Sequence, residues 1–270
     1  MRHAEIDIKC HAIMKVYPNG RRKIIAASKP IFGGKGWELS DKWDSSPRKQ
    51  RKEQSSATDI LRSKRRAAAK LRDYALCNDF RYFVTLTLDA AKIDRYDLAG
   101  VVRKLRTWLD NRVRRCGLKY VLVPEEHKDG AFHFHGFFND AVEVADSGTM
   151  IVGAGKPKRP RSKKEREEWL ADCAKVVYNL PDWALGFSTA IELYGDYDAA
   201  IGYVSKYITK QGEKLGGRWY FSGGDLKTPE VVELRDVDYY EIRTEADVSF
   251  TIPNAGFELS VKEVIFEGSY

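Results

Sequence analysis

The chain has 270 residues, 43% of them hydrophobic and 31% charged, which is enough for one large folded domain or one domain with extensions. No stretch approaches the roughly 18 consecutive apolar residues of a membrane span, and the first residues lack the apolar core of a signal peptide. The four cysteines are scattered and form no Cys-x-x-Cys pair, which argues against a zinc knuckle or a disulfide framework. We therefore expect a protein of the host cytoplasm, with no membrane partner.

The net charge of +7 is distributed unevenly along the chain. Residues 225–270 contain 11 acidic and 4 basic residues, a net charge of −7, so residues 1–224 carry +14. A strongly basic body favours a polyanionic partner, most simply nucleic acid. A solvated basic surface explains the same count equally well.

Composition divides the chain into three predicted segments. Residues 1–50 are predicted to form a β-hairpin, turning at Pro18-Asn19-Gly20, and a linker, because Asn-Gly favours tight hairpin turns. Residues 51–224 form the main domain. Residues 225–270 are an acidic extension with alternating apolar positions, so we expect it to be rich in β-strand and to pair with the N-terminal hairpin.

The main domain begins with a basic stretch. Residues 48–72 contain ten basic and two acidic residues, and apolar residues recur at helical spacing from Ala57 to Ala75. A helix of this kind can lie along a phosphate backbone. The residues expected to contact DNA there are Arg62, Arg65 and Arg66, and the alternative is a merely solvated helix face.

Strands and helices then alternate. The strand at 80–88 is β-branched and aromatic and has apolar residues on both faces, which predicts a central, covered strand. Asp97 caps and Gly117 ends a helix with a continuous apolar stripe. The further predicted elements are a strand at 118–124, a basic loop at 139–163, a helix from about 165 to 178, a strand at 187–193 and a helix at 199–210. This order predicts an α+β fold, an antiparallel sheet with helices packed on it.

Two histidines stand two residues apart on one strand. Residues i and i+2 point to the same face, so His133 and His135 emerge side by side, as a shared metal ion requires. The preceding Lys-Asp-Gly-Ala predicts a hairpin turn that pairs this strand with the one before it. A three-residue loop places Glu125 opposite His133, whereas a two-residue loop places Glu126 there. A lone His-x-His is more often a packed strand than a metal site.

A second chemical stretch lies between Ala199 and Lys210. In a helix, Ile201, Val204 and Ile208 fall on one side, where they can pack on the sheet. The other side is predicted to display two phenols and two ammonium groups together. These are Tyr203, Lys206, Tyr207 and Lys210, and an ordinary amphipathic helix is the alternative.

Three motifs in this order resemble the HUH endonucleases that initiate rolling-circle replication. They are Phe83-Val84-Thr85-Leu86-Thr87, then His133-Phe134-His135, then Tyr203-Val204-Ser205-Lys206-Tyr207. Within that superfamily the chain looks like the two-tyrosine replication initiators (Rep) of single-stranded DNA phages and related mobile elements. The resemblance covers roughly residues 60–225 and leaves the two ends of the chain without an assigned role.

The resemblance implies a site and a reaction. The metal ligands would be His133, His135 and Glu125, which selects the three-residue loop. The ion would be Mn²⁺ or Mg²⁺, with Zn²⁺ also able to bind. Tyr203 and Tyr207 would be the nucleophiles of a transesterification on single-stranded DNA at a replication origin, with Lys206 and Lys210 supplying positive charge near a phenol that is a poor nucleophile at neutral pH. The products would be a 5′-phosphotyrosine and a free 3′-hydroxyl.

The reaction implies partners. A host DNA polymerase would extend the 3′-hydroxyl. A host helicase would unwind the duplex, because Gly153-Ala154-Gly155-Lys156 lacks the first glycine and the final Ser or Thr of a phosphate loop. Other interpretations keep the chemistry, namely a mobilisation relaxase or a transposase of the same superfamily. Two more change it, namely a metal-dependent phosphodiesterase that uses water and a non-catalytic origin-binding protein.

Overall fold

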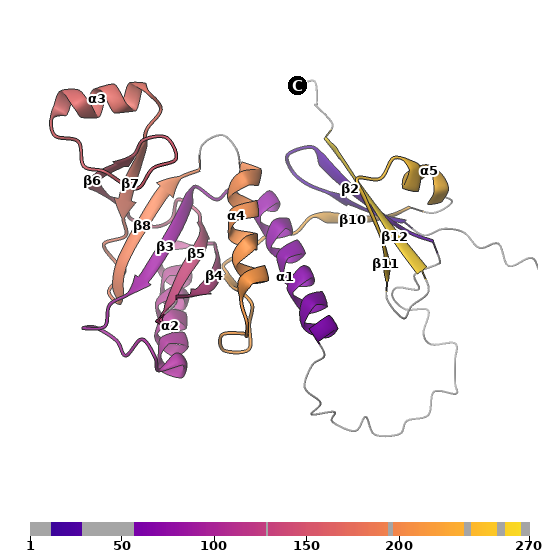
Figure 1. The fold of residues 1–270 in the computed structure, drawn as a ribbon, viewed down its shortest axis with the longest axis horizontal. Helices are drawn as coiled ribbons and strands as arrows, with labels where there is room; N and C mark the ends of the chain where they lie inside the picture. Colours follow the sequence, from indigo (N-terminus) through magenta and orange to yellow (C-terminus); the bar gives the residue numbers. More distant parts are fainter. Residues whose placement is uncertain are drawn as a thin grey trace, which may run out of the picture. The chain divides into compact units, whose positions relative to one another are not determined.

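A computed structural model describes residues 12–28, 57–127, 129–193, 197–234, 239–252 and 257–265 (Figure 1). The chain divides into two compact units. One comprises residues 55–227, and the other combines residues 1–54 with residues 228–270. The expected α+β class is confirmed, with antiparallel sheets and helices in the described residues. No described helix has both the length and the apolar character needed to cross a bilayer.

The unit of residues 55–227 is built on a seven-stranded sheet in the order β6-β7-β8-β3-β5-β4-β9, with every neighbouring pair antiparallel. The strand predicted to be central, β3, has three strands on each side. The strands are β3 (Tyr82–Leu88), β4 (Tyr120–Glu126), β5 (Phe132–Phe138), β6 (Ala145–Ile151), β7 (Lys175–Asn179), β8 (Gly186–Glu192) and β9 (Phe221–Gly223).

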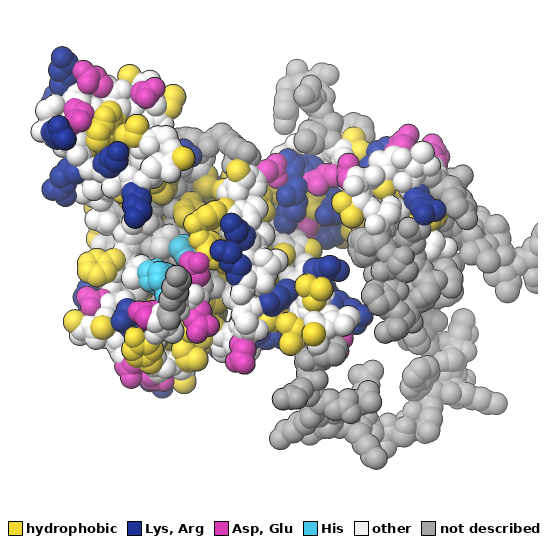
Figure 2. Space-filling view, viewed as in Figure 1, with side chains coloured by type: hydrophobic (Ala, Val, Ile, Leu, Met, Phe, Trp, Pro, Cys, Tyr) yellow, Lys and Arg dark blue, Asp and Glu magenta, His cyan; other side chains and the backbone are white. Residues whose placement is uncertain are grey.

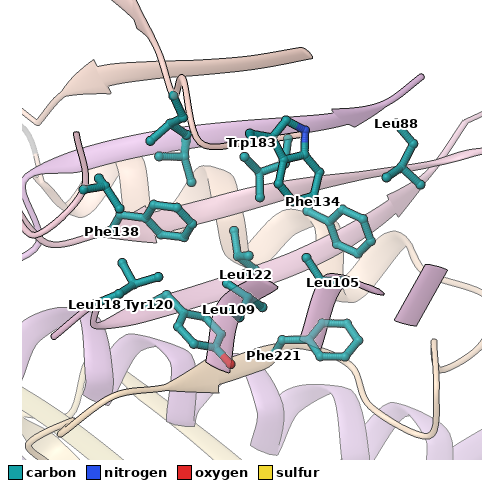
Figure 3. Packing of buried hydrophobic residues seen from close by; sticks show 14 of the residues in the cluster. Leu88, Leu105, Leu109, Leu118, Tyr120, Leu122, Phe134, Phe138, Trp183 and Phe221 are labelled. Atoms are coloured by element: carbon teal, nitrogen blue, oxygen red, sulfur yellow. The ribbon is translucent and has the colours of Figure 1, made fainter. Parts of the chain in front are cut away.

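One face of this sheet is sealed by helix α2 (Leu98–Cys116), which lies behind the sheet in Figure 1. The predicted helix signals are confirmed: the Asp97 carboxylate accepts from the Gly100 amide at 3.0 Å, and Gly117 ends the helix with a left-handed φ of 70°. The cluster under α2 is the main hydrophobic core (Figure 3). Its fully buried side chains include Val84, Leu86, Leu105, Leu109, Leu122, Phe134 and Phe138.

The opposite face carries helix α4 (Tyr197–Lys210), with α1 (Ala57–Cys77) packed alongside it (Figure 1). Gln211, just after α4, ties this helix to the sheet, because its side-chain amide donates to the Pro124 carbonyl at 2.5 Å and to the Trp219 carbonyl at 3.3 Å. The Lys64 ammonium of α1 donates to the carbonyls of Thr209 and Gln211 at the end of α4. The two helices therefore form one layer, anchored to β4.

The region between β5 and β8 differs from the sequence prediction. The expected helix at 165–178 is wrong in its second half: α3 (Lys163–Ala171) ends early, Cys173 takes a φ of 58°, and strand β7 follows. The β-branched pair in β7 joins the sheet, with Val177 opposite Ile191. The expected basic loop at 139–163 is also only partly right, because it contains β6, which pairs with β7.

The second unit holds a five-stranded antiparallel sheet in the order β10-β1-β2-β12-β11. The expectation that the acidic tail pairs with the N-terminal hairpin is confirmed, since β10 pairs with β1 and β12 pairs with β2. The predicted Asn-Gly turn joins β1 to β2, with Gly20 at a φ of 78°. The elements are β1 (Ala12–Val16), β2 (Arg21–Ala27), β10 (Glu230–Leu234), α5 (Tyr239–Thr244), β11 (Val248–Ile252) and β12 (Phe257–Ile265). The predicted apolar positions before Ala12 and the linker at 31–56 lie outside the described residues.

Candidate functional site

The β4–β5 hairpin fixes which carboxylate faces the histidines. Glu125 is directly opposite His133, and the His127 amide donates to the Ala131 carbonyl at 2.8 Å across the turn. Gly130 has a φ of 81°, the left-handed conformation that a glycine supplies in a three-residue loop. Of the two loops that the sequence allowed, the structure contains the three-residue one, so Glu125 lies on the face of the histidines and Glu126 does not.

Each histidine is oriented by a threonine from the neighbouring strand. In the β3–β5 register Thr85 is opposite His135 and Thr87 is opposite His133. The Thr85 hydroxyl lies 3.1 Å from Nδ1 of His135, and the Thr87 hydroxyl lies 3.2 Å from Nδ1 of His133. These hydrogen bonds engage Nδ1 and leave Nε2 as the nitrogen of each ring that can bind a ligand.

Sequence analysis named this threonine strand as a motif but gave its hydroxyls no role. The signal was present in the Thr-x-Thr alternation, which matches the His-x-His alternation. Only the strand register turns two separate alternations into two hydrogen-bonded pairs.

Glu125 and the rings around it have specific contacts. Nε2 of His135 is 2.8 Å from a carboxylate oxygen of Glu125. The His133 ring instead stacks on His127, with centroids 3.7 Å apart, and lies 6.5 Å from the His135 ring. In the described residues no three His, Cys, Asp or Glu side chains are arranged as a ready metal site. Gathering both imidazoles and Glu125 around one ion therefore requires side-chain rotation.

The donor set suits a divalent ion chemically. Burial, with a smaller effect of the neighbouring imidazoles of His127 and His135, lowers the pKa of His133 to about 4. Burial also lowers the pKa of His135, against the opposing effect of its hydrogen bond to Glu125. Both rings are then neutral near pH 7, which is the protonation state that binds a metal.

The two tyrosines of α4 meet the histidine cluster but differ in exposure. The Tyr207 ring stacks on the His135 ring with centroids 4.4 Å apart and planes 10° apart. Its hydroxyl donates to the Tyr203 hydroxyl at 2.5 Å. Tyr203 is 49% exposed and its ring meets Phe83 edge-on, whereas Tyr207 is 6% exposed. Burial, followed by the hydrogen bond with Tyr203, raises the pKa of Tyr207.

The prediction that both phenols lie on the solvent side of α4 is wrong for Tyr207. At 100° per residue, Tyr207 lies at the border between Tyr203 and the buried Val204, so its ring turns toward the sheet. Lys206 is exposed on the outer side. The Lys210 ammonium is 5.9 Å from the centre of the Tyr207 ring, a cation–π distance.

Basic side chains gather over α4 and α1 on the face where the histidines reach the surface (Figure 2). Arg62, Arg65 and Arg66 are all exposed on α1, as predicted, although Arg62 also contacts Asp59 at 3.3 Å. Lys64 does not share this role, because its ammonium is bound to the end of α4. The exposed cations therefore lie on the helix layer that also carries the tyrosines.

Comparison with known proteins gives one finding. No curated protein and no solved structure matches the chain. Residues 81–212 match a family of replication-associated proteins, described by the name ORF2. The matched segment begins just before β3 and ends just after α4, so it contains the threonine strand, the histidine hairpin and the tyrosine helix. This similarity supports a replication-associated protein, a replication initiator of the Rep type.

Proposed function

We propose that this chain initiates rolling-circle replication as an HUH endonuclease, by nicking and rejoining single-stranded DNA through a tyrosine ester. The observation that carries this proposal is the stack of Tyr207 on His135, which places two linked phenols beside two imidazoles and a carboxylate. A structural core has no need of this set on a half-buried sheet face. The set is the one needed for phosphodiester transfer to a phenol.

The two phenols have different parts in this proposal. Tyr203 is the first nucleophile, because it is the exposed one and its oxygen accepts the hydrogen bond from Tyr207. A hydrogen bond donated to that oxygen favours its phenolate over its phenol. The bond from the Tyr203 oxygen to phosphorus forms as the bond from phosphorus to the 3′-oxygen breaks, and that oxygen takes up a proton. Tyr207 acts in the second transfer.

The remaining residues hold the reacting groups in place. The set that would hold a divalent ion is His133, His135 and Glu125, oriented by Thr85 and Thr87. An ion bound there would offset the charge that develops on the phosphate oxygens. The exposed Lys206 and Lys210 supply positive charge beside the phenols, and the arginines of α1 bind the flanking strand.

The test is a covalent-adduct assay. The full chain is incubated with Mn²⁺ and a 3′-labelled pool of random-sequence single strands, then run on a denaturing gel. We expect a DNA-linked protein band that Tyr203→Phe reduces more than Tyr207→Phe and that the double variant abolishes. Tyr178→Phe on β7, outside the cluster, is the matched control and retains the band.

Two results would contradict the proposal. Cleavage without a covalent band in the wild type indicates a phosphodiesterase that uses water. Binding of the pool without cleavage indicates a non-catalytic DNA-binding protein.

A further inference from the structure

One exposed aromatic residue on the face of the histidines takes no part in the proposed chemistry. Phe187 on β8 is 70% exposed, more than any other large apolar side chain in the described residues. A single exposed apolar residue is common on protein surfaces and carries no meaning by itself. The position of Phe187 in the sheet is what distinguishes it.

Strand register places Phe187 in the row of the functional side chains. Phe187 is opposite Thr87, Thr87 is opposite His133, and His133 is opposite Glu125. Directly opposed residues of antiparallel strands point to the same face, so these four side chains form one row across β8, β3, β5 and β4. With strands about 4.8 Å apart, the Phe187 backbone lies about 10 Å from that of His133.

The ring of Phe187 has no aromatic partner in the described part of the chain, unlike the other aromatic residues near the site. Phe83 on β3 contacts His135, Phe137 and Tyr203. Tyr96, which is 58% exposed, lies under the Arg95 guanidinium at 5.7 Å. Phe187 therefore presents a free aromatic surface within one or two nucleotides' reach of the histidines.

We infer that Phe187 is a stacking platform for a base of single-stranded DNA next to the reacting phosphate. This inference rests on the proposed function and adds to it a contact with a base rather than with the backbone. A strand that lies over the histidine row exposes its unpaired bases, and an exposed aromatic ring can stack on any of them. The charge of the unit agrees with such a ligand: residues 55–227 contain 30 basic and 23 acidic residues, a net charge of +7.

The experiment separates base stacking from phosphate binding. Fluorescence anisotropy is measured in EDTA, which prevents cleavage, with labelled dT20 and with a 20-unit abasic strand that has the same phosphates and no bases. We expect Phe187→Ala to weaken binding of dT20 by about 5- to 150-fold and to leave binding of the abasic strand unchanged. Phe187→Trp restores the affinity for dT20, whereas Phe187→Leu does not.

The control is Leu98→Ala, because Leu98 is 45% exposed and belongs to α2 on the other face. It leaves both affinities unchanged. Equal binding of dT20 by the wild type and Phe187→Ala overturns the inference, as does an equal loss on both strands. A change in self-association in Phe187→Ala without a change in DNA binding also overturns it, since Phe187 then contacts protein. All these readings are independent of nicking, so failure of the proposed reaction remains a separate result.

Discussion

The two faces of the seven-stranded sheet are made by the same strands and have opposite characters. Along β3, residues 82, 84, 86 and 88 are buried, while the three residues between them are half-buried. Along β5, Phe134 lies in the core beneath α2, while His135 meets a carboxylate and a phenol under α4. One face is closed by packing, and the other is left partly open with polar groups whose orientation the strands fix. The fold thus separates stability from chemistry at a spacing of one residue.

The largest expected effect breaks the packed face. Phe134→Ala removes a fully buried ring from the core and should lower the free energy of unfolding by about 3–5 kcal/mol, because the cavity adds to the lost burial. Phe187→Ala on the open face is the matched variant and should change it by less than about 0.5 kcal/mol. Urea denaturation measures both. Similar losses in the two variants would show that the open face is also part of the core.

The next effect concerns the polar groups of the open face. Thr87→Val keeps the size of the side chain but removes the hydroxyl that binds Nδ1 of His133, so Mn²⁺ affinity should fall by about 10- to 100-fold. Titration calorimetry with the full chain measures this. Thr189→Val is the control, because Thr189 is opposite Thr85 and its side chain makes no hydrogen bond to a histidine in the described residues. Unchanged affinity in Thr87→Val would remove the threonines from the account of the site.

How far the sequence predicted these two faces follows from the range of each signal. The ends of α2 and the loop of the histidine hairpin were predictable, because Asp97, Gly117 and Gly130 act within a few residues of themselves. The alternation of β3 also predicted a central strand. Local chemistry therefore identified most of the sheet and the face that carries His133 and His135.

The errors occurred where a distant partner decides. The segment after α3 continues in charged, helix-compatible residues, and only its pairing with β6 and β8 makes β7 a strand. Tyr207 lies at the edge of the apolar stripe of α4, and its burial depends on His135, 72 positions earlier in the chain. The roles of the two threonines depend on a register between strands about 50 residues apart.

A smaller effect separates two neighbouring basic residues of α1. Lys64→Met removes the ammonium that binds the last carbonyls of α4 and should cost about 1–2 kcal/mol of stability, since these are charge-assisted hydrogen bonds at a partly exposed site. Arg65→Met should leave stability within about 0.5 kcal/mol.

The same pair should differ in DNA binding. Arg65→Met should reduce the slope of log affinity against log salt for single strands by about 0.7, the value for one lost phosphate contact. Lys64→Met should leave that slope unchanged, and anisotropy titrations at several salt concentrations measure both. An unchanged slope in Arg65→Met would exclude Arg65 from the DNA-binding surface.

The smallest effect has the opposite sign and also belongs to the open face. Gly202 lies inside α4 beside Tyr203, and a Cβ atom added there meets no atom within 4 Å. Gly202→Ala should therefore raise the free energy of unfolding by about 0.5–1 kcal/mol, because alanine loses less backbone entropy in a helix. Gly136→Ala on β5 is the contrasting variant, since its Cβ would lie 1.8 Å from the Val121 carbonyl oxygen, and it should destabilise the protein. Urea denaturation compares the two, and a loss of stability in Gly202→Ala would mean that the protein itself closes over this part of α4, contrary to an open face.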